Sequence, residues 1–162
     1  MAALTPVASV DALISAIEKS GLLSAGELEK VREAAAKAGE PKALARDLVK
    51  SGTLTRWQAE QLINGYHRLL VGNYKLLDQV GTSPTGRLYL AEHAQMGRRH
   101  MLKVLARRLA SNAQAVKHFL DSARNACSLD HRNISHVYDV NQDRIGHYVV
   151  MEHVEEIGRA HV

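Results

Sequence analysis

The chain has 162 residues, 46% of them hydrophobic, and a formal net charge of +4. This length and composition predict a folded protein with one sizeable domain or two small ones, and they exclude a largely disordered chain. The single cysteine, Cys127, excludes an intrachain disulfide and predicts a reducing, cytoplasmic location. We recognise no signal peptide in the sequence and no run of about 18 apolar residues that would predict a membrane segment.

Residues 9–66 are predicted to form four helices arranged as two similar hairpins. The segment ALISAIEKSGLLS at 12–24 is repeated as ALARDLVKSGTLT at 43–55. Each copy is typical of a helix, a glycine turn and a capping box that opens the next helix. Because one hairpin cannot bury its apolar face alone, the duplication predicts a four-helix bundle. The two capping boxes are formed by Ser24 with Glu27 and by Thr55 with Gln58.

The predicted bundle has three functional interpretations. The first is a docking or regulatory module for a protein partner. The second is a DNA-binding helix-turn-helix, but its second helix carries Glu27, Glu29 and Glu33, which phosphates would repel. The third, which the sequence favours, is a bundle that only packs against its neighbour. Solubility explains a net charge of +4 as well as a nucleic-acid partner does, so we expect no nucleic acid.

From Tyr74 onward the sequence changes to short runs rich in β-branched and aromatic residues, which predict strands. A helix is predicted between the third and fourth runs, from about Ser111, as the start of a capping box, to Ser128. Met96-Gly97 and Asp143-Arg144 are predicted to be hairpin turns. The resulting order, β-β-β-α-β-β, predicts an α+β fold with a five-stranded antiparallel sheet and one helix. The five runs are YKLLDQV, RLYLAEH, RHMLKVL, SHVYDVNQ and RIGHYVVMEHV.

Four segments in this half resemble motifs of one enzyme family. GTSPTGRL at 81–88 resembles a glycine-rich loop, HMLK at 100–103 a third-strand lysine motif, and YVVMEHVE at 148–155 a fifth strand and hinge. LDHRNISHVYDV resembles the connection between the helix and the fourth strand. Together, residues 73–155 resemble the N-terminal lobe of bacterial serine/threonine protein kinases. The helical front, followed by WQAEQLINGYHRLLVGNY, is similar to the N-terminal extension of planctomycete kinases.

The resemblance implies an ATP site under the sheet. The glycine loop would approach the phosphates, Lys103 would pair with the α and β phosphates, and hinge backbone groups at Glu152 and Val154 would bond the adenine edge. Met151 would be the gatekeeper. The residues that the resemblance assigns to this site are Gly81, Gly86, Leu88, Met101, Lys103, Met151, Glu152 and Val154.

Several positions depart from the family pattern and predict a degraded site. Ser83 replaces the central loop glycine, and Pro84 lacks an N–H for phosphate. Met101 stands where the family has alanine, and together with Leu88 it narrows the space for the base. Ser122 occupies the position of the helix glutamate that should hold Lys103. The neighbouring Asp121 is not expected to replace it, because it lies about 100° around the helix. The alternative interpretation is that Lys103 is only a lysine at the edge of a cleft and has no role in binding ATP.

The family's catalytic aspartate and Mg²⁺ ligands belong to a C-terminal lobe, and the sequence contains no counterpart of that lobe. The chain is therefore interpreted as truncated at the hinge. Residues 156–162 are interpreted as a non-native or disordered tail, with a short natural tail as the alternative. We expect no catalytic residue, weak ATP binding, no Mg²⁺ and no phosphoryl transfer by this chain.

The remaining polar residues are interpreted as structural. The nine histidines show no metal-ligand spacing, so no metal site is predicted. Arg98-Arg99 and Arg107-Arg108 are interpreted as solvated charge, because no aromatic residue is interleaved with them. Cys127 is expected to be a small buried filler on the helix.

The sequence therefore predicts a fragment of a serine/threonine kinase-like protein that is a pseudokinase. The first alternative is a non-catalytic regulatory or docking module with weak ATP affinity. The second is a helical module that binds nucleic acid.

Overall fold

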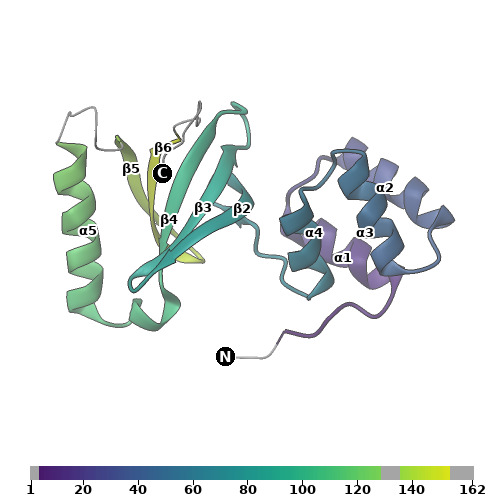
Figure 1. Cartoon of the computed structure of the whole chain (residues 1–162), viewed down its shortest axis with the longest axis horizontal. Coiled ribbons are helices and arrows are strands. Elements are labelled where there is room, and N and C mark those ends of the chain that lie inside the picture. Colours follow the sequence, from purple (N-terminus) through teal and green to yellow (C-terminus); the bar gives the residue numbers. More distant parts are fainter. Residues whose placement is uncertain (1–3, 129–135, 154–162) are drawn as a thin grey trace, which may run out of the picture. The chain divides into compact units, whose positions relative to one another are not determined.

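A computed structural model describes residues 4–128 and 136–153 of the chain, so Val154 and the tail 156–162 lie outside the described residues. It is an α+β structure whose contacts divide it into two compact units, residues 1–78 and 79–162 (Figure 1). No helix among the described residues combines the length and the apolar character that crossing a bilayer requires.

The four helices of the first unit form the two predicted hairpins. Both hairpins turn through a glycine with positive φ, 71° at Gly21 and 78° at Gly52, a region that side chains with a Cβ rarely adopt. The duplication therefore extends from the sequence to the backbone geometry. The helices are α1 (Val10–Ser20), α2 (Ala25–Lys37), α3 (Pro41–Lys50) and α4 (Arg56–Ile63).

One apolar core holds these four helices together. Its members come from all four helices and from the segments that connect or follow them, and five of the members in helices are completely or almost completely inaccessible to solvent. Burial of this kind, rather than the helix propensity of such short segments, stabilises the unit. The five are Leu13, Ile17, Val31, Leu44 and Leu62.

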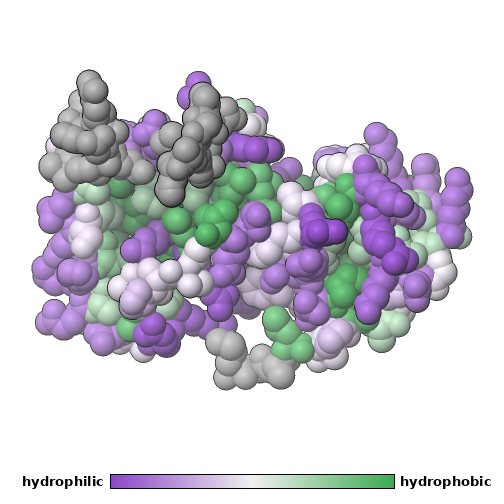
Figure 2. Space-filling model, in the orientation of Figure 1, coloured by the Kyte–Doolittle hydropathy of each residue, from purple (hydrophilic) through white to green (hydrophobic). Residues whose placement is uncertain are grey.

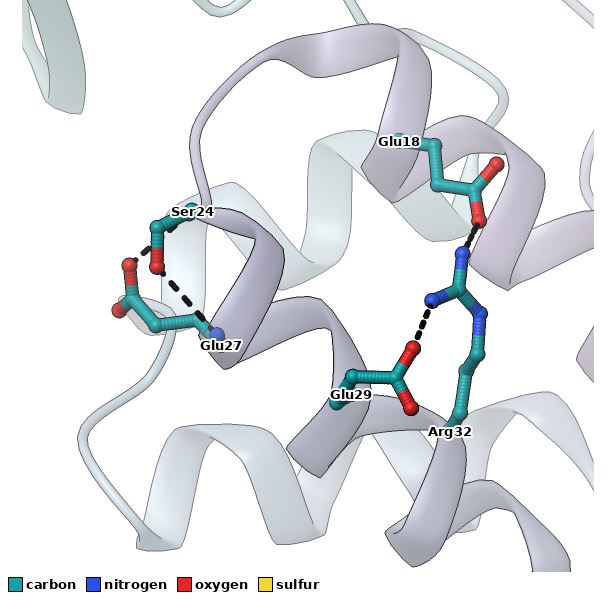
Figure 3. Close-up of polar contacts among 5 residues, drawn as sticks. All are labelled: Glu18, Ser24, Glu27, Glu29 and Arg32. Atoms are coloured by element: carbon teal, nitrogen blue, oxygen red, sulfur yellow. Dashed lines mark hydrogen bonds and ion pairs between the residues drawn. The ribbon is translucent and has the colours of Figure 1, made fainter.

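The first predicted capping box is confirmed (Figure 3). The Glu27 N–H donates to Ser24 Oγ at 3.3 Å, and the Ser24 N–H donates to Glu27 Oε1 at 3.0 Å. The bond from the Ser24 backbone lowers the pKa of the exposed Glu27 carboxyl. Arg32 adds a polar link between neighbouring helices, because its guanidinium pairs with Glu18 of α1 and with Glu29 of its own helix.

The second capping box is also confirmed, and it reaches beyond its own helix. The Gln58 side chain is buried, since the residue is only 4% exposed. Its Oε1 accepts a bond from the Thr55 N–H at 2.9 Å, and its Nε2 donates one to the Leu76 carbonyl at 2.8 Å. The Thr55 hydroxyl accepts from the Gln58 N–H and donates to the Leu77 carbonyl at 2.7 Å. The second hairpin thus holds the first residues of the strand that follows it.

In the described part of the chain the sheet has six strands, one more than predicted, in the order β1-β2-β3-β4-β6-β5. The additional strand contains only Leu70 and Val71, which pair with Lys75 and Tyr74 around the turn at Gly72. Two residues carry no recognisable strand period, which is why the sequence did not show it. The strands are β1 (Leu70–Val71), β2 (Tyr74–Ser83), β3 (Gly86–His93), β4 (Arg99–Leu105), β5 (Val137–Asp143) and β6 (Gly146–Glu152).

The single long helix of the second unit, α5 (Ala113–Cys127), begins one residue later than the predicted capping box implied. Asn112, not Ser111, is the N-cap, since its Oδ1 accepts from the Gln114 and Ala115 N–H groups at 3.0 and 3.1 Å. The short helix η1 (Arg107–Leu109) precedes it, and the Asn112 N–H bonds back to the Leu109 carbonyl. Ser111 therefore lies in the turn between the two helices.

Two further predictions in this unit are wrong in detail. The β5–β6 turn is formed by Arg144 and Ile145, because Asp143 already pairs with Gly146 across the strands. Cys127 is exposed rather than buried, since the apolar face of α5 is carried by Phe119 and Ala123. The Met96-Gly97 turn is confirmed, with φ of 69° at the glycine.

Helix α5 stands beside the strands and covers part of one face of the sheet (Figure 1). Phe119 and Ala123 pack there with Leu105, Val137 and Val149. Figure 2 shows hydrophobic surface over the strands of this unit and hydrophilic surface along the outer side of α5. The packing fixes which residues of the helix can approach the strands, and it sets the geometry of the site below.

The two capping boxes predict losses of stability of different size when glutamine and glutamate are exchanged. Gln58→Glu replaces the Nε2 donor by a buried carboxylate facing the Leu76 carbonyl, so we expect the free energy of unfolding to fall by about 2–3 kcal/mol at neutral pH. The matched exchange Glu27→Gln, at an exposed box, is expected to change it by less than about 1 kcal/mol. Urea denaturation measures both, and equal effects would show that the contact with β2 is unimportant.

Candidate nucleotide site

The register of β3, β4 and β6 brings the predicted site residues to one face of the sheet. Lys103 of β4 pairs with Leu88 of β3 and with Val149 of β6. Two residues earlier, Met101 pairs with Met151 of β6. Because side chains alternate along a strand and paired residues share a face, Leu88, Met101, Lys103 and Met151 all point to the same side. Val149 and Met151 pack with α5, so this is the face that the helix flanks.

Lys103 meets an aromatic ring on α5 instead of a carboxylate. Its Nζ lies 5.9 Å from the centroid of the Phe119 ring, within the range of a cation–π contact. No carboxylate in residues 4–128 and 136–153 forms an ion pair with it. Sequence reasoning did not assign Phe119 this position, although its place one turn before the missing glutamate was the available signal.

The two helix residues considered as partners for Lys103 lie elsewhere. Ser122 is exposed. Asp121 pairs with Lys117 at 2.6 Å and with Arg124 at 3.5 Å, all on the exposed surface of α5. The hydrogen bond from Lys117 lowers the pKa of the Asp121 carboxyl. The Asp121 carboxylate is thus committed to charges on its own helix.

The glycine-rich segment forms a tight hairpin. Strand β2 ends at Ser83, β3 begins at Gly86, and Pro84 and Thr85 make the turn. The Ser83 hydroxyl donates to the Gly86 carbonyl at 3.3 Å and lies 3.2 Å from the Thr85 hydroxyl. The polar groups of Ser83 therefore bond within the turn, and Pro84 has no N–H to offer.

The tip of this hairpin is also bonded to the segment that follows β4. The Ala106 N–H donates to the Thr85 carbonyl at 2.8 Å, and the Arg108 guanidinium donates to the Pro84 carbonyl. Arg108 is a residue that sequence reasoning interpreted as solvated charge. Its bond was not predictable from spacing, because it depends on the register that brings β4 alongside β3.

The two predicted loop glycines have different structural roles. A Cβ at Gly86 would lie 2.1 Å from the Val104 carbonyl oxygen, so the close approach of β3 to β4 requires glycine there. A Cβ at Gly81 would meet only Leu88 Cβ, at 3.9 Å, which is an ordinary contact. Neither residue has a positive φ. Packing alone therefore accounts for Gly86, whereas it leaves Gly81 unexplained.

At the hinge end, the backbone of Glu152 is fixed by the neighbouring segment. Its N–H donates to the His136 carbonyl at 2.8 Å, so this N–H is already used and is not available to donate to a ligand. Val154 lies outside the described residues. Across the described part of the chain, no group of three or more His, Cys, Asp or Glu side chains is placed to hold a metal ion.

Comparison with known proteins identifies relatives for about half of this chain. Over 84 residues the chain is 34% identical to serine/threonine-protein kinase PrkC of Bacillus subtilis. This match covers 52% of this chain and 13% of the relative. Half of the chain is homologous to bacterial serine/threonine protein kinases. PknA of Mycobacterium tuberculosis is a second such kinase, 30% identical over 51% of this chain and 20% of its own length. No model of a protein family matches the chain.

The chain spans a fifth or less of the length of these kinase relatives. Among solved structures, the kinase domain of Mycobacterium tuberculosis PknI is similar, with a TM-score of 0.44 and 25% identity. That similarity covers 52% of this chain and 34% of the PknI domain.

The different surroundings of the two loop glycines give a prediction about stability. Gly86→Ala must displace the Val104 backbone, so we expect it to lower the free energy of unfolding by about 2 kcal/mol or more. Gly81→Ala has room and an ordinary φ, and its effect is expected to stay below about 1 kcal/mol. Thermal and urea unfolding of both variants measures this difference. Equal destabilisation would contradict the assigned role of Gly86.

Proposed function

We propose that the second unit is the N-lobe of a serine/threonine kinase-like protein whose nucleotide site is degraded, that is, a pseudokinase. The observation that carries this proposal is the environment of Lys103. In an active kinase, a carboxylate on the helix orients this ammonium toward the phosphates. Here the ammonium lies over the Phe119 ring, a contact that attracts the charge but directs no hydrogen bond.

The phosphate end of the site supports the same proposal. Phosphate binding by a glycine loop needs several backbone N–H groups directed at one point. Pro84 supplies none, and the Ser83 hydroxyl is used inside the turn. The bonds from Ala106 and Arg108 hold the carbonyl groups of the tip against the segment after β4. The loop is thus organised as a closed hairpin, which does not fit a triphosphate well.

The adenine end retains more of what a nucleotide needs. Leu88 and Met101 provide half-buried apolar surface on the correct face, and the Glu152 backbone is held by its bond to His136. We therefore propose that ATP binds weakly, mainly through its base, and that Mg²⁺ is not needed for this binding. The whole protein would then act as a regulatory or docking module rather than as a catalyst, with the first unit as the surface for a protein partner.

The proposal predicts that the chain does not transfer phosphate. With labelled ATP, Mg²⁺ and a general acceptor protein, we expect incorporation no higher than that of Lys103→Ala, because the lysine is not oriented toward a phosphate. Incorporation that Lys103→Ala abolishes would contradict the proposal. The matched control Lys117→Ala changes an exposed lysine on α5 and is expected to leave the result unchanged.

Weak binding of the base predicts a gain of affinity when the site is enlarged. We expect Met101→Ala to strengthen ATP binding by about tenfold, because it removes the side chain that stands where the family has alanine. Met96→Ala, which truncates an exposed methionine in the β3–β4 turn, serves as the control and should have no effect. The measurement is the chemical shift of the Gly81 and Gly86 amides during an ATP titration. Shifts that stay constant in both the wild type and Met101→Ala would refute nucleotide binding.

A further inference from the structure

A surface pocket lies at the end of the sheet where β4 begins and β6 ends. It is lined by Arg98, Arg99 and His100, by Tyr138 of β5, and by Glu152 and His153. His100 pairs with Glu152 across the strands, one residue away from the Met101–Met151 pair. Alternation along the strands therefore directs His100 and Glu152 to the face opposite the candidate nucleotide site. Arg99 alternates to the side of Met101 and lines the pocket from the start of β4.

A bulge in β5 places an aromatic side chain in this pocket. The pairing of β5 with β6 shifts register between Val137 and Asp139, so Tyr138 is the extra residue of an irregular ladder. Bulges of this kind change the direction of a side chain and are frequent near binding sites. The Tyr138 ring is 54% exposed and makes edge contacts with the His100 and His136 rings, at centroid distances of 5.4 and 4.8 Å.

Positive charge gathers around this ring. Arg98 and Arg99 are both exposed, and neither guanidinium forms an ion pair with a carboxylate of the described residues. Among the described residues that line the pocket, Glu152 is the one acidic side chain, against two arginines and two histidines. Burial lowers the pKa of His100, and the positive potential of His93, Arg98 and His153 lowers it further. The pocket is thus rich in donors and poor in counter-charge.

Guanidinium groups favour one class of ligand in such a setting. Their planar donor pairs bind the oxygens of phosphate in a bidentate way, and two adjacent arginines match the double charge of a phosphate monoester better than the single charge of a carboxylate. An exposed aromatic ring next to the arginines provides apolar contact for the group that carries the phosphate.

We propose that this pocket binds a phosphate monoester, with Arg98 and Arg99 holding the phosphate oxygens and Tyr138 packing against the carrier. This site adjoins the candidate nucleotide site, with which it shares Glu152, but the inference does not depend on the proposed pseudokinase function. The sequence did not reveal it, because Tyr138 lies far from the arginines along the chain and only the β4–β6–β5 pairing brings them together.

The test is a titration of the full chain with three probes: inorganic phosphate, phosphoserine and AMP. We expect shifts of the Gly97, Arg99 and Tyr138 amides with at least one probe, and the probe that binds most tightly identifies the carrier. Binding of AMP at the nucleotide site instead would shift the Gly81 and Gly86 amides. The absence of shifts at Gly97, Arg99 and Tyr138 with all three probes would overturn the proposal.

Variants separate the contributions of charge and ring. Arg98→Gln and Arg99→Gln are each expected to weaken binding at least about tenfold, through loss of a charge-assisted bond. Arg87→Gln, which removes an exposed arginine of β3 outside the pocket, should bind like the wild type. Tyr138→Ala should weaken phosphoserine or AMP but leave inorganic phosphate unchanged. Equal affinity in both pocket-arginine variants and the wild type would exclude this site.

Discussion

The pairing of β4 with β3 on one side and β6 on the other is the constraint on which the second unit depends. It sets Lys103 between Leu88 and Val149, and Met101 beside Met151. A slip of one residue in β4 would turn all of its side chains to the opposite face and would place Leu102, now completely buried, on the side of α5. The same register brings Gly86 against the Val104 carbonyl, where a side chain cannot fit. One ladder therefore determines the candidate nucleotide face, the loop closure and the position of the proposed phosphate pocket.

Within this frame, the loss of one carboxylate changes what the lysine does. A glutamate at position 122 would give Lys103 a directional, charge-assisted partner. With serine there, the ammonium lies over the face of Phe119, a contact that tolerates a range of positions. Asp121 does not compensate, because Lys117 and Arg124 already neutralise it on its own helix. Under the proposed function, the unit would keep the architecture for a nucleotide and lack the interaction that positions its phosphates.

Local signals in the sequence predicted the helices well, and non-local contacts account for most of what was missed. The capping boxes at Ser24 and Thr55 and the glycine turns depend on neighbours within a few residues, and all were predictable. The N-cap at Asn112 was displaced by one residue because η1 continues almost to it, which depends on how the chain leaves β4. The face shared by Leu88, Met101 and Lys103 followed from alternation and from the resemblance to a family. The contacts of Arg108 and Tyr138 arise from segments that meet only in the folded sheet, so no spacing in the sequence could predict them. The contact of Phe119 with Lys103 was signalled only by the place of Phe119 one turn before position 122.

The two helical hairpins show how duplication and strand packing together explain a single difference in residue type. In the first copy, the third residue of the capping box is Glu27, whose carboxylate only accepts a bond and remains exposed. In the second copy, the equivalent Gln58 is buried and must satisfy two groups of opposite kind, the Thr55 N–H and the Leu76 carbonyl. A carboxylate accepts from the first but repels the second, whereas an amide has an oxygen for one and an N–H for the other. The glutamine is therefore specific to the copy that contacts β2, and it marks the second hairpin as the part of the first unit that holds the beginning of that strand.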